Sequence, residues 1–210
     1  FVFQKNNTNL NKNLNKIYKS KNSQLSRPLG EGNWGKERFL YLKSKIKNIN
    51  YFKNKKILEL ACGNGYLLRY LSKKSFNYLY GIDPSLNNKI INNKKIVFLN
   101  KFVDKKLKIN QNFDLIFSIG LYEHAKNINE ITEFSISHLS DKGKILVILP
   151  NFQQSLTKGN PDLFAHEHIN YFTLNTLKQL LRKHGFYIYH HETTLFSGKA
   201  LVVFLSFIPL

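Results

Sequence analysis

Two carboxylates and a glycine turn have the spacing that a nucleotide site requires. Glu59 lies near the end of a short apolar stretch, and the small residues 61–65 follow it. Glycine adopts backbone conformations that other residues rarely do and lets a ligand lie against the main chain. A second apolar stretch, 78–82, ends at Asp83, about 20 residues beyond the glycines, where a carboxylate that binds ribose hydroxyls is expected. The pattern predicts a strand, a tight turn and a helix that together seat a nucleotide.

The residues of this turn distinguish three kinds of nucleotide site. A P-loop needs Lys and then Ser or Thr after its last glycine, but Tyr66 and Leu67 follow Gly65, so a P-loop is excluded. A dinucleotide fold has a third glycine where this chain has Leu68, which disfavours that interpretation. The remaining pattern resembles the first motif of class I S-adenosylmethionine (SAM)-dependent methyltransferases, with Ala61 in place of its first glycine.

That resemblance implies a fold, a cofactor and a set of contacts. The fold is a doubly wound α/β Rossmann-like sheet of seven strands in the order 3-2-1-4-5-7-6, with the last strand antiparallel. The cofactor is SAM, and the product is S-adenosylhomocysteine. The implied cofactor-binding residues are Glu59, Ala61, Cys62, Gly63, Gly65, Asp83, Pro84, Phe102 and Ile119.

A second group of candidates follows the apolar stretch that opens at Asp114. Tyr122, Glu123 and His124 come directly after this predicted strand. They resemble the Leu-x-Glu-His turn that follows the family's fourth strand, where the methyl group meets the acceptor. We therefore expect them to line the site, with His124 as a catalytic candidate, although a loop histidine can also be merely solvated.

A third group lies in the polar connection 151–170. Its run from Glu167 to Phe172 resembles a branch of small-molecule methyltransferases that includes C-methyltransferases of nucleotide-linked sugars. In that branch a His-Glu-His loop performs acid/base chemistry, which implies catalytic roles for Glu167 and His168. Ala165 departs from the branch, because an aromatic hydroxyl is expected there.

This connection has two other interpretations. His166 and His168 could bind a metal together with His190 and His191, but there is no His-Glu-x-x-His pattern and a third ligand has no evident place. We therefore predict no metal site. His168 could also simply cap the following helix and pack against Tyr171.

Composition limits the class of protein. A chain of 210 residues suits one α/β domain, and we expect a polar N-terminal arm over 1–30 before a methyltransferase domain over 31–210. The charge of +19 comes from lysines spread along the chain, which favours a solvated basic surface over a nucleic-acid site. The single cysteine, Cys62, excludes an intrachain disulfide, and we interpret it as a packing residue. With no apolar run near 20 residues, we expect a cytoplasmic protein without a membrane span.

Alternating strands and helices position these groups. Apolar periodicity predicts one strand in the run that ends at the glycine turn and another that opens at Asp114. Further strands are predicted at 78–82, 96–99, 145–150, 186–193 and 199–207, and helices at 34–49, 66–74, 131–139 and 174–184. Trp34 is expected in the core, 140–144 in a turn, and Thr173 as the cap of the last helix.

The resemblance leaves three functions to compare. We expect methyl transfer to a small-molecule acceptor such as a sugar or surface-glycan precursor. An RNA or DNA methyltransferase is disfavoured, because base-amino methyltransferases carry Asn/Asp-Pro-Pro-aromatic where this chain has residues 119–122, and Cys62 is on the wrong loop for a pyrimidine nucleophile. A non-catalytic SAM-binding paralogue is the third alternative.

Overall fold

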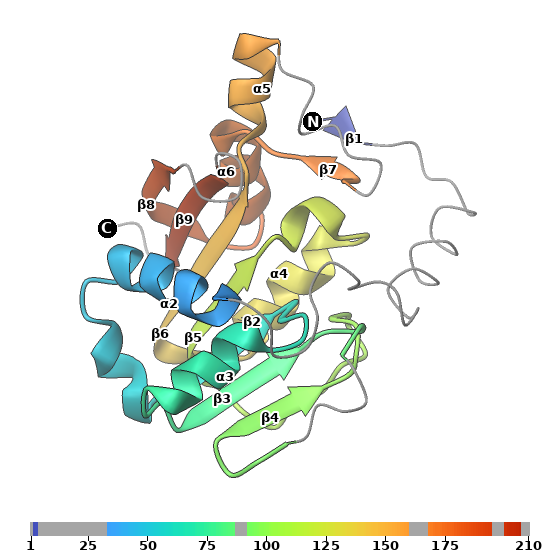
Figure 1. Cartoon of the computed structure of the whole chain (residues 1–210). Helices are drawn as coiled ribbons and strands as arrows, with labels where there is room; N and C mark the ends of the chain where they lie inside the picture. The colour runs from blue at the N-terminus through green and yellow to red at the C-terminus, as the bar shows by residue number, and fades with distance from the viewer. Residues whose placement is uncertain (1, 4–32, 87–91, 160–167, 195–199, 207–210) are drawn as a thin grey trace.

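A mixed sheet of seven strands runs through the middle of the structure (Figure 1). The computed structural model describes residues 2–3, 33–86, 92–159, 168–194 and 200–206. Across the sheet the order is β4-β3-β2-β5-β6-β9-β8, with β9 antiparallel to both neighbours and the other pairs parallel. The bounds are Lys56–Leu60 for β2, Tyr78–Ile82 for β3, Ile96–Leu99 for β4, Phe113–Ile119 for β5, Leu139–Pro150 for β6, Tyr187–Thr193 for β8 and Ala200–Ser206 for β9.

The sheet confirms the predicted α/β class and its seven strands. Numbered along the chain from β2, the observed order is 3-2-1-4-5-8-7, whereas the prediction of 3-2-1-4-5-7-6 omitted one strand. The omitted strand is β7 (Asn170–Tyr171), which lies outside the main sheet and pairs antiparallel with β1 (Val2–Phe3). Val2 and Phe3 were expected in a polar arm or weak helix, and the rest of that arm lies outside the described residues.

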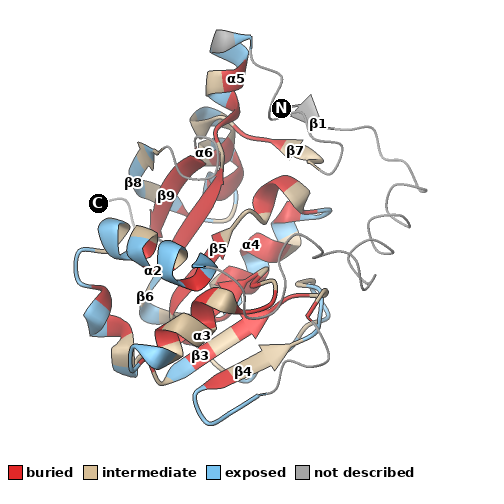
Figure 2. Ribbon diagram, in the orientation of Figure 1, coloured by how far each residue is buried: buried red, intermediate tan, exposed pale blue. Residues whose placement is uncertain are grey.

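Helices cover both faces of the sheet. On one face lie α2 (Trp34–Lys45) and α3 (Tyr66–Lys73), and on the other α4 (Ile128–Ser137) and α6 (Leu174–Arg182). Because successive strand residues point to opposite faces, Ile57 packs in the first layer and Leu58 in the second. The inner strands β2, β5 and β9 are accordingly buried along most of their length, whereas the edge strand β8 is largely exposed (Figure 2). Each fully buried leucine or phenylalanine contributes about 1.5–3 kcal/mol to stability.

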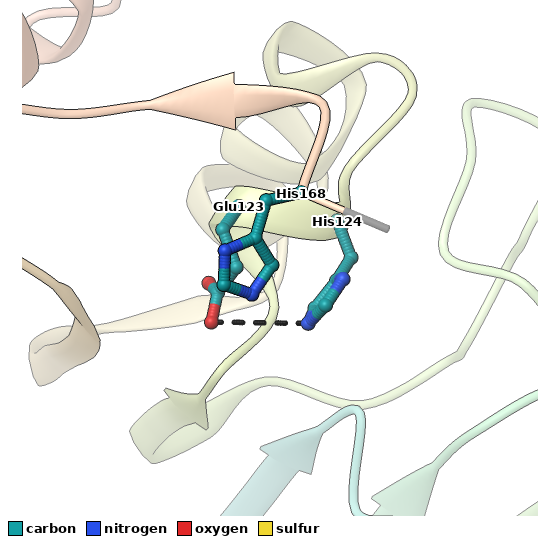
Figure 3. Close-up of side chains that lie close together, drawn as sticks. All are labelled: Glu123, His124 and His168. Atoms are coloured by element: carbon teal, nitrogen blue, oxygen red, sulfur yellow. Dashed lines mark ion pairs between the residues drawn. The ribbon is translucent and has the colours of Figure 1, made fainter. Parts of the chain in front are cut away.

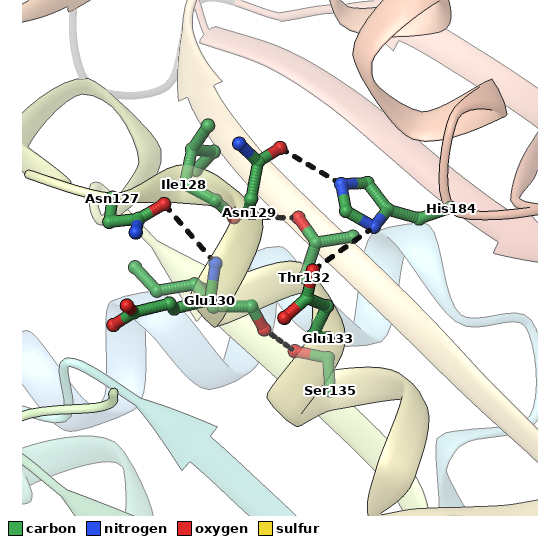
Figure 4. Close-up of polar contacts among 9 residues, drawn as sticks. Asn127, Ile128, Asn129, Glu130, Thr132, Glu133, Ser135 and His184 are labelled. Atoms are coloured by element: carbon green, nitrogen blue, oxygen red, sulfur yellow. Dashed lines mark hydrogen bonds and ion pairs between the residues drawn. The ribbon is translucent and has the colours of Figure 1, made fainter. Parts of the chain in front are cut away.

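The ends of α6 are fixed by local hydrogen bonds and by a contact with α4. Thr173 caps the helix as predicted: its hydroxyl accepts from the Thr176 N–H at 3.3 Å, and its own N–H donates to Thr176 Oγ1 at 3.0 Å. Beyond the helix, His184 Nε2 lies 2.9 Å from Asn129 Oδ1 and its Nδ1 lies 3.9 Å from Glu133 Oε1 (Figure 4). These contacts hold the turn after α6 against α4.

The prediction that Trp34 lies in the core is wrong. Its side chain is 39% exposed, with the Arg38 guanidinium 5.9 Å from its ring centroid. A Cβ atom at Gly35 would lie 2.4 Å from the Tyr66 carbonyl oxygen, so the backbones of α2 and α3 are in close contact at this glycine. This close approach turns Trp34 outward and places Phe39 in the core.

Two element boundaries and one additional helix also differ from the predictions. The segment 140–144 is part of β6 and not a separate turn, since β6 pairs with β5 from Leu139 onward through an irregularity. Helix α4 begins at Ile128, earlier than predicted, because the Asn127 side chain accepts a hydrogen bond from the Glu130 N–H. The polar connection 151–170 contains a helix, α5 (Phe152–Lys158).

Short 3-10 turns complete the described elements, η1 over Ile49–Asn54 and η2 over Tyr122–His124. Among the described residues, every helix is too short or too polar to cross a lipid bilayer.

Candidate active site

The turn between β2 and α3 has three residues in the left-handed region. Ala61, Gly63 and Gly65 have φ of 57°, 55° and 68°. The Gly65 N–H donates to the Cys62 carbonyl at 2.9 Å, and a Cβ at Gly65 would lie 2.3 Å from the Phe98 ring. The backbone therefore keeps the glycine-type conformation at all three alternate positions of the motif. Ala61 holds it with a side chain, at a cost of about 1–2 kcal/mol.

We expect Ala61→Gly to raise the free energy of unfolding by up to about 1 kcal/mol. Relief of the left-handed strain is partly offset by the larger backbone entropy that glycine loses on folding. Urea unfolding of both proteins measures the difference. Ala125→Gly is the matched control, because Ala125 has φ of −71° and gains nothing from glycine. Equal destabilisation by both substitutions would contradict the strain at position 61.

Asp83, directly after the neighbouring strand β3, is hydrogen-bonded to the glycine turn. Its Oδ2 accepts a hydrogen bond from the Gly63 N–H at 2.8 Å, and its Oδ1 accepts from the Ser85 N–H at 2.8 Å and the Ser85 hydroxyl at 2.5 Å. The side chain is buried, and the adjacent Pro84 is half-buried. The predicted ribose ligand therefore also holds the glycine turn in place, a role that no sequence pattern indicated.

Glu59 is a buried carboxylate beside this turn. It is 1% exposed, and neither carboxylate oxygen has a hydrogen-bond partner within the part of the chain that the structure describes. Burial raises its pKa from 4.5 to about 8; the charge of Arg38 opposes this rise and that of Asp83 adds to it. A buried carboxylate without hydrogen-bond partners is costly, so the site suits a ligand that brings a positive charge or hydrogen-bond donors.

The pKa of Glu59 predicts a pH dependence of stability. Because its folded-state pKa is raised, its contribution to stability is fully present below pH 4.5 and is lost as pH rises toward about 8. We expect the melting temperature of the ligand-free protein to fall over this range more steeply than that of Glu59→Gln, whose side chain cannot ionise. Calorimetry of both proteins in a pH series tests this expectation. Parallel curves would show that Glu59 does not titrate in this range.

The other cofactor candidates differ in exposure. Cys62 is buried, and a Cβ at Gly81 would lie 2.8 Å from its sulfur. Burial and the nearby charges of Glu59 and Asp83 raise the pKa of the Cys62 thiol, which is consistent with a packing residue. Ile119 is half-buried at the end of β5. Phe102 is exposed, in the segment after β4.

Glu123, His124 and His168 form a second cluster. Their side chains point to the same side of the turn η2, as Figure 3 shows, and their potential ligand atoms all lie within 4.8 Å of one another. His124 Nε2 is 3.9 Å from Glu123 Oε1, and the two imidazole centroids are 4.8 Å apart. Sequence motifs select these residues from separate segments, and the structure brings them together.

Hydrogen bonds fix the segment that leads from His168 into β7 against η2. The Ile169 N–H donates to the Glu123 carbonyl at 2.8 Å, and the Asn170 amide donates to the carbonyls of Tyr122 and Ala125 at 3.0 and 2.7 Å. We call these three hydrogen bonds the clamp. Through the backbone, the clamp fixes the position of His168 relative to His124. No sequence pattern indicated this role of Asn170.

A small pocket opens beside the cluster. Its lining is mainly aromatic and polar: Glu123, Pro150, Phe152, His168, Asn170, Tyr171 and Phe172. Of these, only Glu123 and His168 were predicted as site residues. The cap of α6 is Thr173, so the alternative in which His168 caps that helix is wrong, although its ring centroid lies 6.5 Å from that of Tyr171. Glu167 and His166 lie outside the described residues.

Both groups lie where a nucleotide-dependent enzyme of this topology is expected to bind its ligands. Parallel strands β2, β3, β5 and β6 end at one edge of the sheet, so the glycine turn, Asp83 and η2 all follow strand ends there. This defines a Rossmann-like α/β domain with a glycine turn and two buried carboxylates at the carboxyl edge of the sheet, next to a polar cluster. More particularly, the chain belongs to the methyltransferase domain family, whose model matches residues 34–191.

Characterised relatives match only part of this chain. It is 28% identical over 116 residues to a tRNA U34 carboxymethyltransferase of Helicobacter pylori (strain HPAG1), covering 49% of this chain and 43% of that protein. It is 28% identical over 92 residues to the C-methyltransferase NovU of Streptomyces niveus, covering 44% and 22%. For a ubiquinone biosynthesis O-methyltransferase of Rickettsia bellii the identity is 25% over 117 residues, covering 52% and 48%. The matched regions thus span less than half the length of each of these relatives.

Solved structures share the fold over most of the chain. A SAM-dependent methyltransferase from Mesorhizobium loti has a TM-score of 0.61 at 18% identity, covering 84% of this chain and 98% of that one. Magnesium protoporphyrin IX methyltransferase from Synechocystis PCC 6803, solved with bound S-adenosylhomocysteine, has a TM-score of 0.63 at 13% identity, covering 93% and 98%.

Proposed function

We propose that the chain transfers a methyl group from SAM to a small-molecule acceptor. The observation that carries this proposal is the buried carboxylate of Glu59 beside a left-handed glycine turn that Asp83 closes. A ligand with an amino group and a ribose complements these groups, since Glu59 suits a positive charge and Asp83 suits hydroxyl donors.

Glu59, Gly63, Gly65 and Asp83 form the proposed cofactor seat, and they would bind SAM and align its methyl group with the acceptor. When bound, SAM supplies a methyl group on a sulfonium, which an acceptor nucleophile attacks in line with the breaking carbon–sulfur bond. Gly63 and Gly65 let the ligand approach the main chain, while Glu59 and Asp83 would orient its polar ends. Alignment of reacting atoms in this way can lower a barrier by about 7–11 kcal/mol.

The second cluster would contact the acceptor. Glu123 and His168 line the pocket, and His124 lies beside them at the carboxyl edge of the sheet. We propose that this cluster promotes proton loss where the acceptor requires it, with Glu167 from the preceding loop as a further candidate. The run 167–172, which resembles the branch with sugar C-methyltransferases, supports a sugar or surface-glycan precursor as the acceptor class. The similarity to the C-methyltransferase NovU supports methyl transfer to a small molecule.

A second candidate function is RNA methylation. The relative from Helicobacter pylori is named for tRNA, and the chain carries a net charge of +19. We expect any RNA affinity to be nonspecific, so that it falls steeply with salt and shows no sequence preference. Filter binding with unrelated RNAs across a salt series measures this. Tight, selective binding at physiological salt would favour the RNA enzyme instead.

Calorimetric titration with SAM, S-adenosylhomocysteine and NAD tests the proposed cofactor. We expect the first two to bind and, at about 100 times the dissociation constant, to stabilise the protein by about 2.7 kcal/mol. Binding of NAD without SAM would overturn the assignment. Incubation with nucleotide sugars, other glycan precursors and RNA, read out as S-adenosylhomocysteine, then identifies the acceptor class. SAM binding without turnover of any acceptor would favour a non-catalytic paralogue.

A further inference from the structure

We propose that Glu123, His124 and His168 together bind one divalent transition-metal ion, and that this ion holds an oxygen atom of the acceptor. The inference rests on the proposed function for its acceptor but not for the metal site itself. It differs from the sequence-based expectation, which found no third ligand, because Glu123 becomes a partner of His168 only in the folded chain.

The spacing of the three groups suits a shared ion. Their potential ligand atoms lie within 4.8 Å of one another. Adjacent ligands bonded to one ion at 2.0–2.2 Å are themselves about 3 Å apart, so small side-chain rotations would close the site. The 3.9 Å between His124 Nε2 and Glu123 Oε1 is longer than a hydrogen bond. This separation leaves room for an ion between the two atoms.

The donor set indicates the kind of metal. Two imidazoles and one carboxylate suit Zn²⁺, Mn²⁺ or Fe²⁺, whereas Mg²⁺ and Ca²⁺ prefer oxygen ligands. Glu123 is only 5% exposed, and a carboxylate held away from water is stabilised by a cation. A Cβ at Gly120 would lie 3.3 Å from Glu123 Oε1, so the glycine leaves space for this carboxylate at the end of β5.

The backbone organises the donors before any ion binds. Ile169 and Asn170, the two residues after His168, are fastened to η2 and Ala125 by three hydrogen bonds to main-chain carbonyls. No ligand side chain takes part in those bonds. Substituting a ligand should therefore remove metal affinity while leaving the clamp intact.

The neighbouring pocket indicates what the ion would bind. Glu123 and His168 line it, so coordination positions that the protein leaves open would face the acceptor. A hydroxyl coordinated there would be more acidic and would lose its proton to water. The oxygen lone pair would then form the bond to the methyl carbon as the carbon–sulfur bond breaks, with its electron pair remaining on sulfur. We therefore infer an acceptor with a hydroxyl at or beside the methylated position.

Titration of the chelator-treated full chain with Zn²⁺ tests the site. We expect one ion per chain by calorimetry, and visible absorption bands when Co²⁺ is used instead. Glu123→Gln, His124→Ala and His168→Ala should each weaken Zn²⁺ binding by at least about 100-fold, since even residues that only support metal ligands contribute 10- to 100-fold. His190→Ala and His191→Ala, exposed on β8, are matched controls and should bind Zn²⁺ normally.

Zn²⁺ affinity that is absent in the unaltered chain, or unchanged in the three ligand variants, would overturn the metal site. SAM titration of the same samples separates the two proposals. Normal SAM binding without Zn²⁺ binding would leave the methyltransferase function standing and remove the metal. Zn²⁺ binding without SAM binding would support the metal site and remove the proposed function.

Discussion

Replacing His168 with alanine is expected to lower the turnover number by about 10²- to 10⁴-fold while leaving SAM affinity nearly unchanged. His168 lies in the cluster with Glu123 and His124 and lines the pocket beside it, whereas Glu59 and Asp83 belong to the proposed cofactor seat. A group that acts in the chemical step affects the rate more than it affects cofactor binding. Single-turnover kinetics with an accepted substrate and calorimetric titration with SAM measure the two quantities on one variant.

A purely structural role for His168 would give a different result. Loss of its contacts with the rings of His124 and Tyr171 would lower the melting temperature, while the protein that remains folded would turn over normally. His190→Ala, on the exposed edge strand β8, is the control for removal of a histidine outside the site. A normal rate for folded His168→Ala would identify His168 as a packing residue.

Asp83→Ala should weaken SAM binding by about 10- to 150-fold. A hydrogen bond to a charged group contributes about 1.5–3 kcal/mol, and each 1.4 kcal/mol corresponds to a factor of ten in affinity. The variant should also be less stable, since the Gly63 N–H loses the carboxylate that accepts its hydrogen bond. Calorimetric titration gives the affinity, and urea unfolding gives the stability.

Two further variants separate direct binding from support of the turn. Ser85→Ala removes the hydroxyl that donates to Asp83 Oδ1 but keeps the carboxylate and its bond to Gly63. Asp83→Asn keeps an oxygen acceptor for Gly63 but removes the charge. If Asp83 binds ribose, affinity should fall strongly in Asp83→Asn and little in Ser85→Ala. An unchanged dissociation constant in folded Asp83→Ala would exclude Asp83 from the cofactor seat.

Local sequence patterns were sufficient to predict that Glu59, the glycine turn and Asp83 lie together. Short apolar runs ending at Leu60 and Ile82 determine two buried parallel strands, and chain continuity places the residues after each run at the strand's carboxyl end. Glu59, the turn and Asp83 therefore meet at one edge as soon as β2 and β3 pair. Even the substitution at Ala61 kept the left-handed backbone, because the turn's own geometry requires it.

Orientation and burial depended on contacts between elements. Periodicity placed Trp34 on the inner face of its helix, but the close approach of Gly35 to Tyr66 rotated that face. The apolar pattern likewise gave no sign of how deeply Glu59 is buried or of its raised pKa. Both depend on layers of α2 and α3 that the strand's own residues do not specify.

The cluster of Glu123, His124 and His168 could be recognised only in the tertiary structure. Glu123 and His124 could be selected together from one local motif and His168 from another, but nothing in either segment indicated that His168 lies against this pair. Their meeting depends on the Asn170 amide donating to the carbonyls of Tyr122, in η2, and Ala125, directly after it, and on a two-residue strand too short to carry a periodic signal. Sequence patterns report short-range preferences, whereas this cluster is made by hydrogen bonds between segments far apart in the chain, which form only when the sheet has brought β5 and the connection after β6 to the same edge.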